Sequence, residues 1–158
     1  MTKEAIANDR KRQMQDRRVQ DRRVQEIKQD DQQETDVRLK KEQAILNAIS
    51  QQIFDKKGIN ILAIDVRGIS TITDYQIIAE GGVARHLKAL SFAIQGLMKE
   101  LDVSLYRIEG EDTDWIIMDY YDVIIHLMTP DMRFKYALEQ LWNKGAIVDV
   151  DIVVPKGA

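Results

Sequence analysis

The first 43 residues of this 158-residue chain cannot form a hydrophobic core of their own. They hold ten apolar residues and no aromatic residue, whereas residues 44–158 hold sixty apolar residues and all ten aromatic ones. A segment this polar cannot bury enough apolar surface to offset its conformational entropy. We therefore expect a charged N-terminal extension over residues 1–43, helical or disordered, followed by one folded domain.

The extension contains a direct repeat, Asp-Arg-Arg-Val-Gln, at residues 16–20 and again at residues 21–25. Its period of five matches neither the 3.5 nor the 3.6 apolar period, so no coiled-coil seam is predicted. Residues 1–28 carry nine Lys or Arg against five Asp or Glu, a local charge of +4. Such a charge suits RNA phosphates, and an rRNA contact by residues 1–43 is one interpretation. The composition fits a solvated extension without a partner better.

Apolar patterning over residues 44–142 predicts helices and strands in the order αββαβββα. The predicted strands are residues 61–66, 75–79, 105–108, 115–118 and 123–128, with a hairpin turn at 119–122. The helices flank them at 45–57, 81–101 and 129–142, and the last has a predicted apolar face of Phe134, Leu138, Leu141 and Trp142. The fold class is α/β (α+β), with a mixed five-stranded sheet flanked by helices. The tail, residues 143–158, could add an edge strand, dock on a partner or stay loose.

Several function classes are disfavoured by the residues themselves. The chain has no cysteine, which excludes disulfides, thiolate metal sites and a cysteine nucleophile. No Walker loop or hydrolase elbow occurs, so we expect no enzyme and no cofactor. No apolar run has the length of a membrane helix, and the N-terminal residues lack the apolar core of a signal peptide, so we expect neither. A soluble, cytoplasmic protein that does not bind membranes is expected.

Two weak ligand signals remain. Gly81 and Gly82 offer backbone amides at a helix start, with Arg85 and His86 following, but glycine is also what a tight turn needs. Four carboxylates crowd residues 109–114 without the spacing of a calcium loop. A solvated acidic loop facing a basic partner is the better interpretation, and no metal is expected.

Three blocks of sequence carry a resemblance. Residues 65–75, Asp-Val-Arg-Gly-Ile-Ser-Thr-Ile-Thr-Asp-Tyr, are similar to a signature of the ribosomal silencing factor family, also called Iojap. Residues 81–90, with Arg85-His86, resemble a second stretch of that family. The best match runs from Glu109-Gly110-Glu111 through residues 114–119 and 122–128 to Trp142. Together the blocks cover residues 45–142 in the family's order.

The resemblance implies a translation repressor that is not an enzyme. Members of the family bind the large ribosomal subunit through its protein fourteen (uL fourteen), stop the small subunit from joining, and are commonly homodimers when free. Their fold is nucleotidyltransferase-like without the catalytic acids, and here the strand at 105–108 has no acid. Residues 44–158 carry a charge of −5, which suits a basic ribosomal protein.

The resemblance and the chemistry of the side chains together predict a protein-binding surface. Exposed acids around an aromatic anchor are typical of such surfaces. The predicted residues are Asp74, Arg85, His86, Glu109, Glu111, Trp115, Asp119 and Asp122. The alternative is that Trp115 and His126 belong to the core and that Asp65 and Asp74 bond turn amides.

The chain departs from the family pattern at three positions. Ile69 replaces a lysine and Val83 replaces a serine. Tyr121 replaces the glycine of the hairpin, so we expect a turn of another type, without a positive φ at this position.

Overall fold

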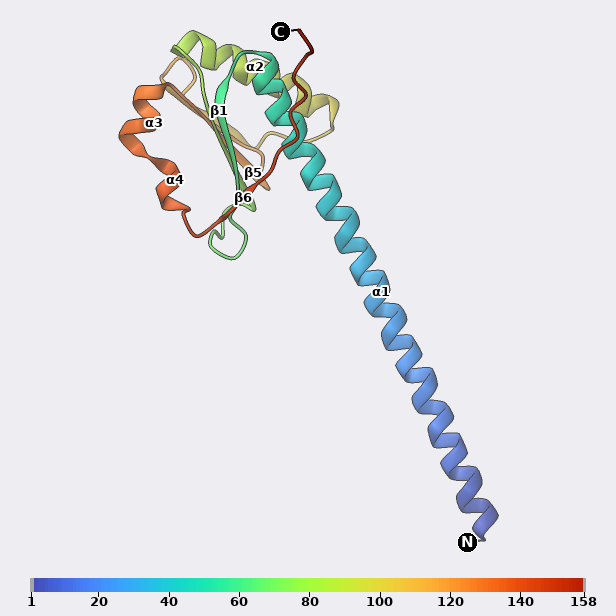
Figure 1. Cartoon of the computed structure of the whole chain (residues 1–158). Coiled ribbons are helices and arrows are strands. Elements are labelled where there is room, and N and C mark those ends of the chain that lie inside the picture. The colour runs from blue at the N-terminus through green and yellow to red at the C-terminus, as the bar shows by residue number, and fades with distance from the viewer. Residues whose placement is uncertain (1, 158) are drawn as a thin grey trace. The chain divides into compact units, whose positions relative to one another are not determined.

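The computed structural model describes residues 2–157, which divide into two compact units, one ending at Glu42 and one beginning at Gln43. Helix α1 (Lys3–Asp55) begins in the first unit and ends in the second (Figure 1). Its residues in the first unit are helical rather than disordered, and nearly all are exposed. Gln, Arg, Glu and Lys are good helix formers, and Arg38 forms an ion pair at 3.7 Å with Glu42, four residues further along the helix.

The second unit is built on one mixed sheet in the order β3-β4-β5-β2-β1-β6. Its strands are β1 (Ile59–Asp65), β2 (Tyr75–Glu80), β3 (Arg107–Glu109), β4 (Trp115–Asp119), β5 (Val123–Met128) and β6 (Ala146–Val148). Only β2 and β5 run parallel; the other neighbours are antiparallel. The sheet has six strands rather than the predicted five, because the C-terminal segment adds β6 beside β1.

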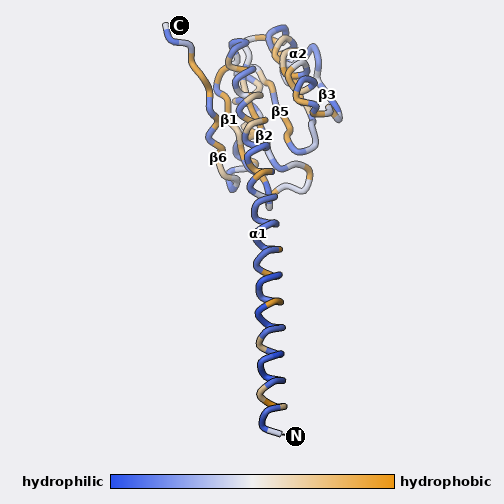
Figure 2. The backbone as a smooth tube through the Cα atoms, turned by 90° about the vertical axis from the view of Figure 1, so that its right-hand side faces the viewer, coloured by the Kyte–Doolittle hydropathy of each residue, from blue (hydrophilic) through white to orange (hydrophobic). Residues whose placement is uncertain are grey.

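Helices cover both faces of this sheet. Helix α2 (Ala84–Glu100) and the last turns of α1 lie on one face, and α3 (Pro130–Tyr136) and α4 (Leu138–Leu141) lie on the other (Figure 1). Because strand side chains alternate between faces, Ile77 and Ile125 join the larger core under α2, and Ile78 and Met128 join the smaller core under α4. Hydrophobic colour follows the strands, while the exposed part of α1 is hydrophilic (Figure 2).

The predicted last helix is wrong in one respect. Ala137 has φ 44°, a left-handed conformation that ends α3 and starts α4 on a new axis. As a result the predicted apolar face divides: Leu138 is buried and Trp142 packs beside it, but Phe134 is 90% exposed and Leu141 70% exposed. Arg133, on α3, pairs with Glu80 at 3.3 Å and Glu139 at 2.8 Å, which joins both short helices to β2.

The prediction for the β4–β5 turn is also wrong, since Tyr121 does adopt a positive φ of 69°. Local contacts offset the steric cost of this conformation. Asp119 Oδ1 accepts the Tyr121 amide at 2.9 Å, and the Tyr121 ring lies 5.0 Å from the ring of Tyr106. A side chain that binds its neighbours can therefore occupy a turn position that favours glycine.

After β6 the chain stays extended beside α1, held by amide side chains. Gln43 Nε2 donates to the Asp149 carbonyl at 2.9 Å, and Asn47 Oδ1 accepts the Asp151 amide at 3.1 Å. Gln51 both donates to the Val153 carbonyl, at 3.1 Å, and accepts its amide, at 2.7 Å. Four residues rise about 6 Å along a helix, and two residues span about 6.6 Å in an extended chain. The bonding side chains, four residues apart in α1, therefore match tail residues that are two apart.

Candidate functional site

The face of the sheet that carries α3 and α4 also holds a hydrogen-bonded chain of three side chains. The strand register places Trp115 of β4, His126 of β5 and Gln76 of β2 on this face. Trp115 Nε1 donates to His126 Nδ1 at 3.2 Å, and His126 Nε2 lies 2.9 Å from Gln76 Oε1. Since the indole can only donate, Nδ1 must accept, and the proton of the neutral imidazole is on Nε2.

His126 is therefore a structural residue that orients Trp115. It is 7% exposed, and burial lowers its pKa to about 4, so it is neutral at pH 7. The rings of Trp142 and Trp115 both lie 5.9 Å from the His126 ring, and Tyr136 lies 5.0 Å from Trp115. Trp115 is half-buried, so it is both a packing residue and a surface residue.

Three of the eight predicted residues meet at one end of the sheet. Because β2 and β5 are parallel and β4 is antiparallel to β5, Asp74, Asp122 and Asp119 lie at the same end of their strands. The Asp122 carbonyl accepts the amide of Asp74 at 3.2 Å, which fixes these two residues side by side. Asp122 is exposed and Asp119 is half-buried. Arg107 of β3 pairs with Asp119 in the strand register, so this end of the sheet holds three carboxylates and one cation.

Four of the other five lie at the opposite end of the strands, and Glu109 pairs with Ile117 in the middle of β4. Trp115 begins β4, Glu109 ends β3, and Glu111 follows in the exposed loop between them. Lys88, one turn after Arg85 in α2, bonds Asp112 of the same loop at 2.7 Å. The two ends are about 13 Å apart along β4. The eight residues thus do not form one cluster.

His86 has a role within the fold. Its Nδ1 accepts the Gly82 amide at 3.2 Å, and its Nε2 lies 2.7 Å from the Lys56 carbonyl, so it joins the start of α2 to the end of α1. The Gly81 amide bonds the Met128 carbonyl at 3.1 Å. Both glycine amides that suggested an anion site are therefore used by the protein itself.

Between the two ends, the sheet face adds residues that the sequence did not indicate. Ile117 and Ile124 are half-buried and lie between Trp115 and the end with three carboxylates. Gln76 was also missed, although a lone polar residue inside a buried strand was an available signal. The result is an apolar strip with an aromatic residue at one end and carboxylates at both.

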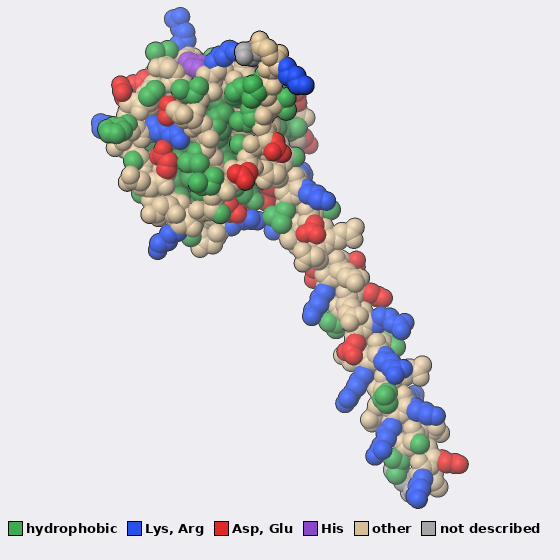
Figure 3. All heavy atoms as spheres, in the orientation of Figure 1, with side chains coloured by type: hydrophobic (Ala, Val, Ile, Leu, Met, Phe, Trp, Pro, Cys, Tyr) green, Lys and Arg blue, Asp and Glu red, His purple; other side chains and the backbone are tan. Residues whose placement is uncertain are grey.

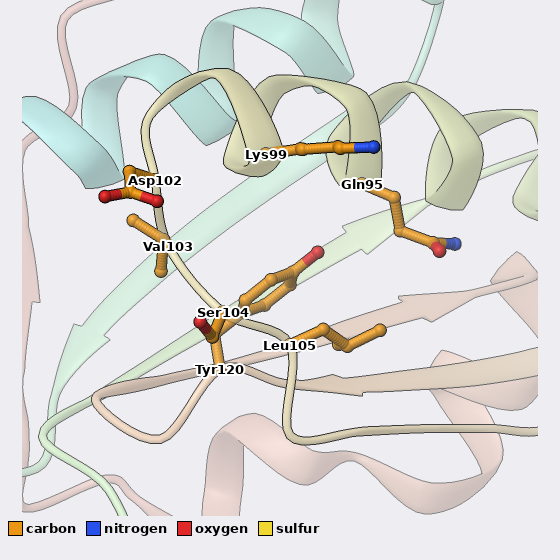
Figure 4. A pocket seen from close by; sticks show the side chains of 7 residues that line it. All are labelled: Gln95, Lys99, Asp102, Val103, Ser104, Leu105 and Tyr120. Atoms are coloured by element: carbon orange, nitrogen blue, oxygen red, sulfur yellow. The ribbon is translucent and has the colours of Figure 1, made fainter.

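A pocket of about 390 Å³ lies elsewhere, between the end of α2 and the segment before β3. In Figure 4 the Tyr120 hydroxyl points between Lys99 and Gln95, and among the described residues it has no hydrogen-bond partner. Burial raises the pKa of Tyr120 to about 12, so it stays a neutral phenol. The lining offers no nucleophile paired with a base.

Metal-site and membrane-span features are both absent from residues 2–157. No three His, Asp or Glu side chains in that range are grouped as a metal site. No helix in the same range is long and apolar enough to cross a membrane.

Comparison with known proteins places residues 39–157 on a family model described as ribosomal silencing factor during starvation. The ribosomal silencing factor of Bacillus subtilis is 31% identical over 111 residues, 70% of this chain and 94% of the relative. That of Haemophilus influenzae is 35% identical over 100 residues, 63% of this chain and 98% of the relative. A mouse protein named for mitochondrial assembly of the large ribosomal subunit is 37% identical over 88 residues, 53% of this chain and 39% of its own length.

A solved structure agrees in fold. A crystal structure of a protein from Chromobacterium violaceum superimposes with a TM-score of 0.62 at 30% identity. The match covers 72% of this chain and 95% of that one.

Proposed function

Because the chain belongs to the ribosomal silencing factor family, we propose that it binds the large ribosomal subunit and blocks joining of the small one. The direct partner is uL fourteen of the large subunit, and the effect is repression of translation in the cytoplasm. The free protein is a homodimer, and no step of its action is catalytic. The nucleotidyltransferase-like fold serves here as a scaffold for binding.

The observation that supports this proposal is the surface from Trp115 to Asp122. A half-buried aromatic ring, held by His126, stands beside the apolar strip of Ile117 and Ile124. Fixed aromatic anchors with apolar neighbours are the usual energetic centre of a protein interface, because little conformational entropy is lost on binding.

Charge supports the same surface. Asp74, Asp119 and Asp122 border the strip at one end, Glu109 lies beside Ile117 in its middle, and Glu111 borders the other end. Ribosomal proteins are basic, and complementary charge raises the rate and fixes the register of association. In this proposal Arg85 and His86 form only the rim, since both ring nitrogens of His86 are already bonded.

Co-sedimentation with separated large subunits tests the proposal. Asp122→Lys and Glu111→Lys each reverse an exposed acid that makes no side-chain hydrogen bond within the described residues. Glu100→Lys, an exposed acid at the end of α2, makes the same charge change outside the proposed surface. We expect the first two variants to lose binding and the third to retain it.

The functional readout is the amount of 70S ribosome formed when small subunits are added. The unchanged protein and Glu100→Lys should reduce it, and the other two variants should not. Equal binding by all three variants would contradict the proposed surface, and binding without less 70S would contradict the blocking role.

A further inference from the structure

The N-terminal unit has a charge distribution that the function proposed for the second unit, here called the silencing domain (residues 43–158), does not explain. The family model begins at residue 39, so nearly all of this unit lies outside it. At 100° per residue, the cations of residues 3–28 divide unequally between two halves of helix α1. One half, the basic face, carries Lys3, Arg10, Lys11, Arg17, Arg18, Arg22 and Lys28 with only Glu4 and Asp21. The other half carries Arg12 and Arg23 with Asp9, Asp16 and Glu26.

The cations of the basic face are available for binding. Lys11, Arg18 and Arg22 are exposed and, with Met14, Gln15 and Val19, border one shallow surface of the helix. Within the described residues of this unit, none of these three cations has a carboxylate within 4 Å. Spacings of seven and four residues place them about 10 Å and 6 Å apart along the axis. Figure 3 shows Lys and Arg side chains along this part of α1.

The apolar residues of the unit exclude two other kinds of partner. Ile6, Met14, Val19, Val24 and Ile27 are exposed at intervals of eight, five, five and three residues, which lack the repeat of three and four residues that forms an apolar stripe. Without an apolar stripe, the helix has no seam for a second helix and no face to insert into a lipid surface. What remains is a polar, anionic partner.

Arginine is the main cation of residues 3–28, with six arginines against three lysines. Its planar fork of donors matches phosphate oxygens in two parallel hydrogen bonds, which a lysine cannot make. We propose that the basic face of α1 binds the phosphate backbone of RNA without reading its sequence. This binding needs no ribosome and does not depend on the function proposed above.

Fluorescence anisotropy of a labelled 20-base-pair RNA duplex, titrated with the full chain at 50 to 200 mM salt, tests the proposal. Arg18→Gln/Arg22→Gln removes two cations from the basic face. Arg12→Gln/Arg23→Gln removes two from the other half and is the matched control, with the same composition and net charge. Glutamine and arginine have similar helix propensity, so the helix is retained in both, and circular dichroism verifies this.

We expect the unchanged chain to bind in the micromolar range at 50 mM salt and to weaken steeply as salt rises. Arg18→Gln/Arg22→Gln should lower the affinity about tenfold and reduce the slope of log affinity against log salt by about 2. The control should change the affinity less than about threefold. Equal losses in the two variants would overturn the assignment to this face. Equal binding of poly-glutamate would overturn RNA as the partner.

Discussion

Replacing Gln51 by alanine should release the C-terminal segment from helix α1. The Gln51 side chain makes two hydrogen bonds to the backbone of Val153, at 3.1 and 2.7 Å. A protein hydrogen bond contributes about 0.5–1.5 kcal/mol net, and water competes at this exposed site. The two bonds together should therefore contribute about 1–2 kcal/mol to the free energy of unfolding, less a few tenths for the better helix propensity of alanine.

The substitution has a second consequence that must be separated from the first. Gln51 Nε2 also lies 2.8 Å from Asp55 Oδ1 within the helix, and this contact is lost as well. A double-mutant cycle isolates the contribution of the tail. The second change is deletion of residues 151–158, which removes Val153 but leaves Asp55 and strand β6 in place.

Urea denaturation followed by circular dichroism gives the four unfolding free energies. In the complete chain Gln51→Ala should cost about 1–2 kcal/mol, and in the shortened chain less than about 0.5 kcal/mol. An equal cost in both backgrounds would refute the reasoning, because the side chain would then act within the helix alone. Hydrogen exchange at the Val153 amide should also accelerate in Gln51→Ala.

Three other predictions concern buried or strained residues. Because the pKa of His126 falls to about 4 in the folded state from 6.5, stability should be complete above pH 6.5 and decline by about 3 kcal/mol as pH falls to 4. In His126→Gln the free energy of unfolding should depend less on pH between 6.5 and 4. An unaltered dependence would rule out His126 as its cause. Tyr120→Phe removes a buried hydroxyl without a described partner, so the melting temperature should stay level or rise, and a clear fall would indicate a partner for the hydroxyl. Ala137→Gly removes the strain of a left-handed alanine and should raise the free energy of unfolding in urea by about 0.5–1 kcal/mol. The control Ala93→Gly, in the middle of α2, should lower it by a similar amount. A loss of stability in both variants would contradict strain at Ala137.

Strands and helices that are determined by local apolar patterning can be predicted from the sequence alone. The isoleucine-rich runs predicted β1, β2 and β5, and the amphipathic spacing after Gly82 predicted α2. The family resemblance and the mixed α/β class are confirmed by the family model and the solved relatives.

Features that depend on non-local contacts could not be predicted in this way. The apolar tail allowed an edge strand as one of three outcomes, and strand β6 forms because β1 offers it a free edge, which the tail sequence does not show. The break at Ala137 was hidden, because alanine is a helix former and the apolar spacing continues through it. Tyr121 was misread for a related reason, since its φ is held by Asp119 and Tyr106 rather than by its own preference.

The candidate site also combines features that the sequence indicates with features that depend on non-local contacts. Its residue types, acids around an aromatic anchor, were visible in the sequence. Their grouping was not, because it follows from β2 and β5 being parallel, which puts Asp74 beside Asp122 and far from Glu111. His126 and Gln76 hold Trp115 in place, and this role becomes evident only when the three strands are known to be neighbours.

If both proposals hold, the chain binds one ribosome through two surfaces of opposite charge on separate units. The second contact is then intramolecular, and its strength is set by an effective concentration rather than by the concentration of free protein. Loss of Arg18 and Arg22 should raise the protein concentration needed to block subunit joining. The block at saturation should stay the same, because the silencing domain alone prevents joining. Asp122→Lys should fail to block joining at every protein concentration, so the two variants distinguish the accessory contact from the contact that blocks joining.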